Sequence, residues 1–414
     1  MTHFYMNGNR MFDVVVVGAG VIGTAIAREL ALQRPKWAVA VLEKEPGPAR
    51  HTSGRNSGVV HAGFNQKPGT FKAKLCVEGN RRLRALGAQG KVPLQVLGTL
   101  VVAAEQREIA VLEELLKRGQ DNGVEGLRLL SGSELRALEP NALGIAALHA
   151  PTGGIVDSGA LVRRLAAEAT EAGVRFFYEH KITSLEETGK GYEAAVYSPS
   201  GATRVRSKIL INAAGLYADV IARQLGVGAG YAIIPFRGEY YKIRPEKAGC
   251  VRSMIYPAPD TRYPFLGVHW TKKIDGGLAV GPNAVLAFGR ESYRATDIHV
   301  GETLAMVATA PFWRMLGNPE FRQAARRQMA VSLSRRRFFQ EAARLVKGCR
   351  MDDLIPGSAG NRAQLVNRQG ELVDDIVVET RGASVHILNA VSPGMTSSLP
   401  FAEHIARTAA AFAA

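Results

Sequence analysis

Cysteine is scarce in this sequence, with only Cys76, Cys250 and Cys349 among 414 residues. Their separations match neither a disulfide framework nor the paired spacing of a zinc site. The pattern is typical of a protein from a reducing compartment. We therefore expect neither a metal centre nor cysteine chemistry.

Long apolar runs are absent as well. No stretch approaches the roughly 20 apolar residues of a membrane-spanning helix. The leader MTHFYMNGNRM lacks the apolar segment and small-residue cleavage site of a secretory signal. The sequence thus predicts a cytoplasmic protein, and its length of 414 residues predicts two domains.

Acidic residues are outnumbered, with 37 Asp and Glu against 52 Lys and Arg, a net charge of +15. Residues 314–350 hold ten basic and two acidic residues, a net +8. The simplest interpretation is a solvated basic face. The alternative is peripheral docking on the anionic inner face of a membrane, with Phe338 and Phe339 beside the arginines at 335–337. No RNA-binding module accompanies the charge, so a nucleic-acid partner is not expected.

What the sequence does contain is a β-α-β pattern near its start. An apolar run, residues 12–17, comes first and is followed by a G-x-G-x-x-G motif formed by Gly18, Gly20 and Gly23. A helical stretch, residues 24–33, comes next. A second apolar run, residues 37–42, then ends at the acid Glu43. In dinucleotide-binding folds these glycines allow the tight turn, the approach of the pyrophosphate and close helix packing, while the acid accepts from a ribose hydroxyl. No second motif of this kind follows a strand. Electrons are therefore expected to leave to oxygen, a quinone or a protein carrier rather than to a second dinucleotide.

A polar loop, residues 46–70, follows the second apolar run. It is dense in Gly, Ser, Thr and Asn. Small residues let backbone N–H groups and short hydroxyls approach a phosphate and a flavin ring, so we interpret the loop as a return to the dinucleotide. A solvated surface loop is the alternative.

Several short strings in the chain carry a family resemblance: HTSGRNSGVVHAG, KPG, FKAKLC, TGGIVD, NAAGLYAD, PFRGEYY, YPFLGVH and VGPNAVLAF. From about Asp13 onward the chain resembles the L-2-hydroxyglutarate dehydrogenase/oxidase family of the D-amino acid oxidase-type FAD-dependent oxidoreductases. It differs from that family at Arg55, where histidine is usual, and at Asn65 and Gln66, where an aromatic pair is usual. All three lie near the expected flavin and bear on which 2-hydroxy acid fits.

The resemblance implies FAD as the cofactor. The motif, the loop and two later small-residue segments together supply the expected cofactor contacts: Gly18, Gly20, Val21, Ile22, Gly23, Glu43, Lys44, Thr52, Ser53, Gly54, Asn56, Ser57, Gly58, Ala214, Gly215, Gly394, Met395 and Thr396. It also implies that the last helix directs its N-terminus at the flavin. In AGNRAQ the resemblance makes Arg362 the residue that binds a substrate carboxylate, although Ala363 replaces the usual proline.

Alternating, aromatic-rich strands between residues 235 and 285 predict an antiparallel sheet that binds substrate. They carry a set of side chains able to bind a dicarboxylate: Arg237, Tyr240, Tyr241, His269 and Lys272. Each could instead face solvent or be a buried hydroxyl. Oxidation of a hydroxy acid needs a base near neutrality, and histidine titrates closest to that range. We prefer His61, in the flavin loop, with His269 as second candidate or substrate ligand.

We therefore predict an α/β fold in which a three-layer, Rossmann-like FAD-binding domain is joined to an α+β substrate domain built on an antiparallel sheet. The FAD-binding domain would comprise residues 1–88, 150–232 and 350–414, and the substrate domain residues 89–149 and 233–349. The predicted activity is FAD-dependent oxidation of L-2-hydroxyglutarate, with oxygen or a quinone as electron acceptor. The alternatives are an amine or amino-acid oxidase of the same fold, a tRNA-modifying flavoprotein and a non-catalytic flavin scaffold.

Overall fold

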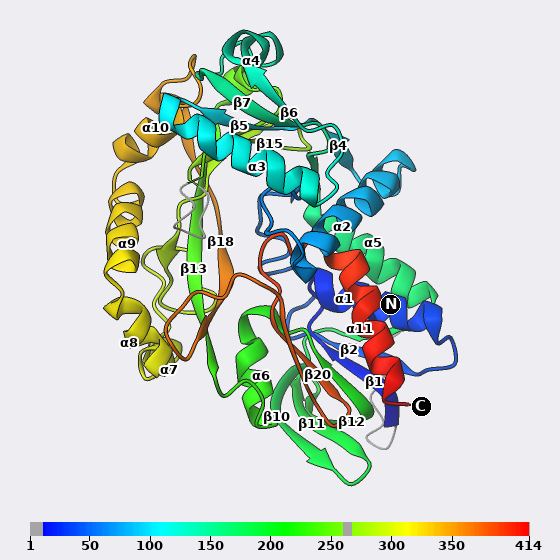
Figure 1. Cartoon of the computed structure of the whole chain (residues 1–414). Helices are drawn as coiled ribbons and strands as arrows, with labels where there is room; N and C mark the ends of the chain where they lie inside the picture. Colours follow the sequence, from blue (N-terminus) through cyan, green and yellow to red (C-terminus); the bar gives the residue numbers. More distant parts are fainter. Residues whose placement is uncertain (1–10, 260–266, 414) are drawn as a thin grey trace.

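The computed structural model describes residues 11–259 and 267–413. The leader and most of the YPFLGVH string lie outside the described residues. Two large sheets dominate the molecule, and two long strands of the second sheet extend toward the first (Figure 1). Within the described residues no helix has the length and apolar character needed to cross a membrane.

The first sheet has eight strands around a parallel centre in which β1 pairs with β2 and β12, β2 with β9, and β12 with β20. Its strands are β10 (Lys181–Thr188), β11 (Gly191–Ser198), β12 (Gly201–Asn212), β1 (Met11–Val17), β2 (Val39–Leu42), β9 (Arg175–Phe177), β20 (Ser384–Asn389) and β19 (Val377–Arg381). The strands β10 to β12 form an antiparallel meander.

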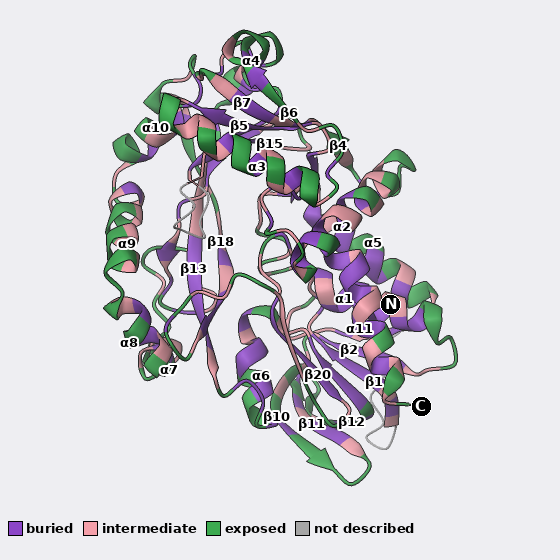
Figure 2. Cartoon of the chain, in the orientation of Figure 1, coloured by how far each residue is buried: buried purple, intermediate pink, exposed green. Residues whose placement is uncertain are grey.

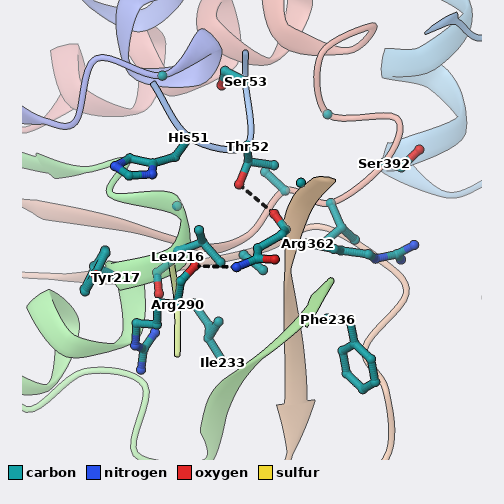
Figure 3. Close-up of a pocket in the computed structure, with 18 of the residues that line it drawn as sticks. His51, Thr52, Ser53, Leu216, Tyr217, Ile233, Phe236, Arg290, Arg362 and Ser392 are labelled. Atoms are coloured by element: carbon teal, nitrogen blue, oxygen red, sulfur yellow. Dashed lines mark hydrogen bonds between the residues drawn. The ribbon is translucent and has the colours of Figure 1, made fainter. Parts of the chain in front are cut away.

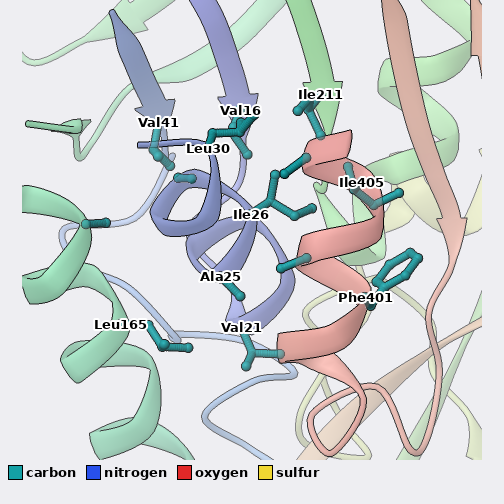
Figure 4. Close-up of a cluster of buried hydrophobic side chains, with 14 of the residues drawn as sticks. Val16, Val21, Ala25, Ile26, Leu30, Val41, Leu165, Ile211, Phe401 and Ile405 are labelled. Atoms are coloured by element: carbon teal, nitrogen blue, oxygen red, sulfur yellow. The ribbon is translucent and has the colours of Figure 1, made fainter. Parts of the chain in front are cut away.

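Both faces of this sheet are buried, which explains the unbroken apolar run in β1. Val14 and Val16 pack under helices on one face, and Val15 and Val17 face a second core on the other. The covering helices on the first face are α1 (Val21–Gln33), α2 (Phe71–Ala88), α5 (Ser158–Glu171) and α11 (Ser398–Ala411). Figure 4 shows α1 between α5 and α11, next to the strand residues Val16, Val41 and Ile211. The second face is covered by α6 (Ala218–Gln224) and residues of the meander.

Contact between α2 and the segment before α11 is close. Gly79 of α2 lies against this segment, and a Cβ at Gly79 would come within 1.9 Å of the Thr396 carbonyl oxygen. A three-stranded sheet lies nearby, made of β3 (Val59–Val60), β8 (Gly154–Val156) and β4 (Leu94–Val96). These contacts join the polar loop, α2 and the end of the chain.

The second large sheet has nine strands and is mostly antiparallel. They are β17 (Val285–Leu286), β13 (Tyr231–Ile243), β16 (Leu278–Gly281), β15 (His269–Lys272), β14 (Met254–Pro257), β5 (Thr99–Ala103), β7 (Ala146–Ala150), β6 (Arg128–Ser131) and β18 (Leu354–Asn367). Strands β13 and β18 pair antiparallel along nearly their whole length. Because β18 belongs to this sheet, the boundary predicted at residue 350 does not follow the sheets; otherwise the domain division stays a proposal.

Helices cover this sheet at two places. Near the top of Figure 1 lie α3 (Ile109–Asp121) and α4 (Gly132–Leu138). Along the outer side lie α7 (Val300–Val307), α8 (Ala310–Gly317), α9 (Pro319–Ser332) and α10 (Arg335–Ala343). Asn318 and Ser334 cap α9 and α10 by accepting from backbone N–H groups. Figure 2 shows exposed residues along the outer side of α9 and α10.

Candidate cofactor and substrate site

A cavity of about 1670 Å³ lies where the two large sheets meet. The carboxyl ends of β1 and β2 line one side, and residues of β13, β15 and β18 line the other. Segments 49–61 and 390–396 also reach it. Ligands of open α/β sheets bind at the carboxyl ends of the strands, and this volume exceeds the roughly 300–1,000 Å³ of an ordinary small-molecule pocket. The cavity can hold a dinucleotide and a small substrate together.

The glycine motif shapes the turn between β1 and α1. Gly18 has φ +101°, a conformation that L side chains rarely adopt. A Cβ at Gly23 would come within 2.1 Å of the Gly18 carbonyl oxygen. Gly20 lines the cavity at the start of α1, where the Val21 N–H has no acceptor within the helix and donates to Ser53 Oγ at 2.9 Å. The turn therefore presents bare backbone and a helix N-terminus to a ligand.

Glu43 stands at the carboxyl end of β2 and lines the cavity. Its Oε2 accepts from the Ala19 N–H at 2.7 Å, and its Oε1 accepts from the Glu45 N–H at 3.0 Å. Each carboxylate oxygen has further lone pairs. The acid is thus oriented by backbone and can still accept from ribose hydroxyls.

The polar loop is tied both to itself and to the second sheet. Asn56 donates to the Ser53 carbonyl at 2.8 Å and accepts from the Gly58 N–H at 2.8 Å. Thr52 Oγ1 donates to the Asn361 carbonyl of β18 at 2.9 Å, as Figure 3 shows. The loop therefore joins the two walls of the cavity.

His61 follows β3 and lines the cavity. Its N–H donates to Thr396 Oγ1 at 3.1 Å, and its Nε2 lies 3.4 Å from Ser392 Oγ. Burial, with a contribution from the Lys72 cation, lowers the pKa of His61 to about 4. The imidazole is neutral at neutral pH and able to accept a proton.

His269 begins β15 on the opposite wall. Its Nδ1 lies 2.9 Å from the Gly267 carbonyl, and because a carbonyl only accepts, Nδ1 carries the hydrogen and Nε2 is the basic nitrogen. The ring stacks on Tyr256 with centroids 4.0 Å apart. Burial lowers the pKa of His269 to about 4 despite that carbonyl, and His61 adds to the effect.

Two cationic side chains line the same cavity, Lys72 of α2 and Arg362 of β18. Lys72 is 5 % exposed, and its Nζ donates to Asp374 at both the carbonyl oxygen, at 2.6 Å, and Oδ1, at 2.9 Å. Burial lowers the pKa of Arg362 to about 10, against the attraction of the same Asp374. Figure 3 shows Arg362 extending from β18 on the side of Ser392. Lys72 and Arg362 thus share one exposed acid as counter-charge.

Comparison with known proteins agrees with this geometry. Residues 13–408 match the family model described as FAD dependent oxidoreductase. The chain belongs to the FAD-dependent oxidoreductase family. Curated relatives include an L-2-hydroxyglutarate dehydrogenase from Indibacter alkaliphilus, 37% identical over 94% of this chain and 96% of the relative. The mitochondrial L-2-hydroxyglutarate dehydrogenase of Mus musculus is also 37% identical, over 95% and 87%. The resemblance found in the sequence is confirmed.

A solved structure shows the same fold. The dithionite-reduced L-α-glycerophosphate oxidase of Mycoplasma pneumoniae with FAD bound superposes with a TM-score of 0.76 at 24% identity, covering 97% of this chain and 94% of that one. The predicted α/β class and the FAD cofactor of the family are confirmed. The residues present fit FAD, since a glycine turn open to the cavity, an oriented acid at a strand end and a large void lie together.

Most of the predicted FAD contacts line the cavity: Gly18, Gly20, Val21, Ile22, Glu43, Lys44, Thr52, Ser53, Asn56, Ser57, Ala214, Gly215, Gly394, Met395 and Thr396. Three predicted glycines do not, namely Gly23, Gly54 and Gly58. A Cβ at any of these three would come within 2.0–2.6 Å of a backbone oxygen. These three glycines allow close packing against the backbone.

Three of the five side chains predicted to bind substrate from the second sheet do not line the cavity. Tyr241 packs on Phe338 in the core, with ring centroids 4.7 Å apart. Lys272 Nζ donates to the Ala248 carbonyl at 2.7 Å, and Arg237 binds Glu239 at 2.9 Å. Neighbouring residues of a strand point to opposite faces of the sheet. Because Tyr240 lines the cavity, Tyr241 points away from it. These three are structural in this chain.

Sequence analysis missed Lys72, because a lysine in a helical segment is ordinarily a surface residue. It also missed a polar cluster between the walls. Lys44 Nζ lies 2.5 Å from both Glu45 Oε1 and Glu291 Oε1, while His51 Nε2 lies 2.9 Å from that Glu45 oxygen. Tyr217 donates to Glu291 at 2.8 Å. Only the long-range pairing of residues 44–51 with 291 could have revealed the cluster.

The three positions that depart from the resembled family all line the cavity. The Arg55 guanidinium carbon lies 4.0 Å from the centre of the Tyr293 ring, a cation–π arrangement. Gln66 Nε2 donates to Asn65 Oδ1 at 2.8 Å, and Asn122 donates to the Gln66 carbonyl at 2.8 Å. These side chains make this part of the wall polar.

Proposed function

We propose that this protein oxidises a 2-hydroxy dicarboxylate, L-2-hydroxyglutarate, to the corresponding 2-oxo acid with bound FAD. The observation that carries the proposal is the pair of buried cations, Lys72 and Arg362, in one cavity with two neutral histidines. A dicarboxylate has one carboxylate for each cation. At ~4 Å and an effective dielectric near 20, each such pair contributes about 4 kcal/mol before desolvation is subtracted. The names of the curated relatives support the same substrate.

The chain's own residues provide binding and proton transfer. Arg362 and Lys72 hold the two carboxylates and so orient C2 and its hydroxyl. His61, neutral because of burial, takes the hydroxyl proton on a ring nitrogen as hydride leaves C2. His269 Nε2 is the second candidate base or a ligand of the hydroxyl. Bound FAD supplies the two-electron acceptor for that hydride. Tyr240 retains its proton because burial raises its pKa, and it is a hydrogen-bond donor in the wall.

A panel of substrates under anaerobic conditions tests the proposal through flavin bleaching. L-2-hydroxyglutarate should bleach the flavin, while glycine, sarcosine and D-amino acids should not. Bleaching by an amino acid alone would make the protein an amino-acid oxidase instead.

The second cation has its own test. Lys72→Met should raise the apparent dissociation constant for L-2-hydroxyglutarate roughly 10- to 100-fold, the effect of losing one charged hydrogen bond. The same variant should change the apparent dissociation constant for a 2-hydroxy monocarboxylate only slightly. Lys272→Met is the matched control, because Lys272 bonds outside the cavity. Equal effects of the two variants would remove Lys72 from the substrate site.

We also propose oxygen or a quinone as the electron acceptor and peripheral contact with an anionic membrane. The sequence interpretation needs one correction, since Phe338 is 1 % exposed and cannot insert into lipid. The outer helices instead expose Trp313 at 61 % and Leu333 at 79 %, among exposed arginines. Arg335 donates to the Met351 and Leu354 carbonyls and is occupied structurally.

The membrane proposal is tested with liposomes. Binding to anionic vesicles should fall with added salt, and should fall further when Arg322, Arg326 and Arg336, all exposed, are changed together to Ser, at about 1 kcal/mol each. Equal binding to neutral and anionic vesicles would end the proposal.

A further inference from the structure

Two of the three cysteines lie together in the fold although 99 positions separate them. Cys250 is the last residue of η3 (Pro245–Cys250), and Cys349 lies between α10 and η4 (Met351–Asp353). Their Sγ atoms are 3.0 Å apart. Both side chains are half-buried at the edge of the core formed by Trp270, Phe338 and their neighbours, so a small reagent can reach them.

The backbone on both sides of the pair is held by one residue. Asn141 Nδ2 donates to the Cys250 carbonyl at 3.0 Å, and the Asn141 carbonyl accepts from the Lys347 N–H at 2.9 Å. Lys272 adds a bond to the carbonyl of Ala248 at 2.7 Å. These bonds anchor both segments and so hold the two sulfurs close together. Forming an S–S bond of about 2.0 Å requires only a short further approach.

We propose that Cys250 and Cys349 are a redox-active dithiol that a low-molecular-weight disulfide converts into an intramolecular disulfide. The sequence predicted no cysteine chemistry, because spacing along the chain does not report this contact.

Thiol–disulfide exchange accounts for every atom and electron. Cys349 thiolate attacks one sulfur of the small disulfide, forms a mixed disulfide and releases one small thiolate. Cys250 sulfur then attacks Cys349 sulfur and expels the second small thiol. The two protein thiols are oxidised by two electrons, the small disulfide is reduced to two thiols, and the two protons of the cysteines are taken up by solvent and the leaving thiolates.

Local electrostatics assign the order of attack. The hydrogen bond between the two sulfurs, 3.0 Å apart, lowers the pKa of Cys349 and, together with burial, raises that of Cys250. The thiolate is the nucleophile in exchange, so Cys349 reacts first. Cys76 is the internal contrast, because complete burial raises its pKa to about 12.

The crosslink would tie together the ends of a long segment. Between the two cysteines lie β14 to β17 and the helices α7 to α10, including His269. Closing such a loop restricts the unfolded chain more strongly than the folded one. The oxidised protein should therefore unfold at a higher temperature than the reduced protein, with the FAD-binding sheet unchanged.

The experiment exposes the FAD-loaded protein to oxidised glutathione and digests it with trypsin after blocking free thiols. Cleavage after Lys247, Arg252, Lys347 and Arg350 should release AGCVR linked to GCR, and dithiothreitol should separate them. Of three titratable thiols, two should be lost while Cys76 remains. Cys76→Ser is the matched control and should crosslink and gain thermal stability as the wild type does.

The single variants decide the chemistry. Cys250→Ala should stop at a glutathione adduct on Cys349, whereas Cys349→Ala should react much more slowly. Neither should show the oxidation-dependent rise in unfolding temperature. Glutathione adducts on both cysteines of the wild type without the linked peptide would overturn the proposal, as would loss of Cys76 in place of either.

Discussion

The two walls of the cavity are built in different ways. The cofactor wall comes largely from residues 18–58 and positions its ligand with backbone: a glycine turn, a helix N-terminus and an acid oriented by N–H groups. The substrate wall uses side chains from separate segments, chiefly Lys72, His269 and Arg362. Changes to the cofactor wall should therefore act through chain packing, and changes to the substrate wall through single functional groups.

The largest expected effect is on the cofactor wall. Gly23→Ala should abolish FAD retention, because the new methyl would lie 2.1 Å from the Gly18 carbonyl oxygen and force the turn apart. FAD retention is measured as flavin absorbance per mole of purified protein. Gly317→Ala in α8 is the control, since no atom lies within 4 Å of a Cβ there. Full FAD content in Gly23→Ala would show that the turn adapts to the methyl group. The cofactor wall would then depend less on chain packing than the comparison of the two walls predicts.

Among single functional groups, the histidine preferred as base comes next: His61→Ala should lower the rate of flavin reduction by roughly 10²- to 10⁴-fold while substrate still binds. Rapid mixing under anaerobic conditions separates the two quantities. The parallel variant His269→Ala should have the smaller effect on rate. If the order is reversed, His269 is the base and His61 the orienting residue.

Both Arg362→Ala and Arg362→Lys should raise the apparent dissociation constant for the dicarboxylate, and Arg362→Lys should raise it less. The lysine keeps the positive charge but loses the bidentate hydrogen bonds of the guanidinium group. Spectral titration of the flavin measures both. Identical affinities in wild type and Arg362→Ala would leave Lys72 as the carboxylate ligand in this wall.

The smallest effect lies outside the cavity, at His386 in β20. Burial lowers the pKa of His386 from 6.5 to about 4. Between these values the unfolded chain binds a proton that the folded chain does not, so stability falls as pH falls through this window. His386→Gln should shrink the loss of unfolding free energy between pH 7 and ~pH 5 by about 2 kcal/mol, as measured by urea titration. An unchanged difference would show that this imidazole titrates normally.

The cofactor wall could be predicted from the sequence because its signals are local. Gly18, Gly23 and Glu43 belong to one β-α-β unit, and the structure has β1, α1 and β2 at the predicted places, with α1 beginning at Val21 and β2 at Val39. Local periodicity also predicted the change to an antiparallel sheet after residue 235.

The substrate wall could be predicted only in part, since long-range pairing decides it. Alternation along β13 shows that Tyr240 and Tyr241 face opposite ways, but not which of them faces the cavity. Lys72 donates to Asp374, 302 positions away, a contact that no local pattern reports. Phe338 likewise becomes a core residue only through packing with residues far away in the sequence, among them Tyr241.

The close packing of Gly79 against the Thr396 carbonyl has a consequence for biosynthesis. The first strand and the glycine turn leave the ribosome early, yet Thr396, which lines the cavity and accepts from the His61 N–H, is translated hundreds of residues later. Domains made in one continuous stretch can fold as they emerge. Here the cavity lacks part of its lining until residues 390–396 have been added, so we expect stable capture of FAD to follow translation of that segment.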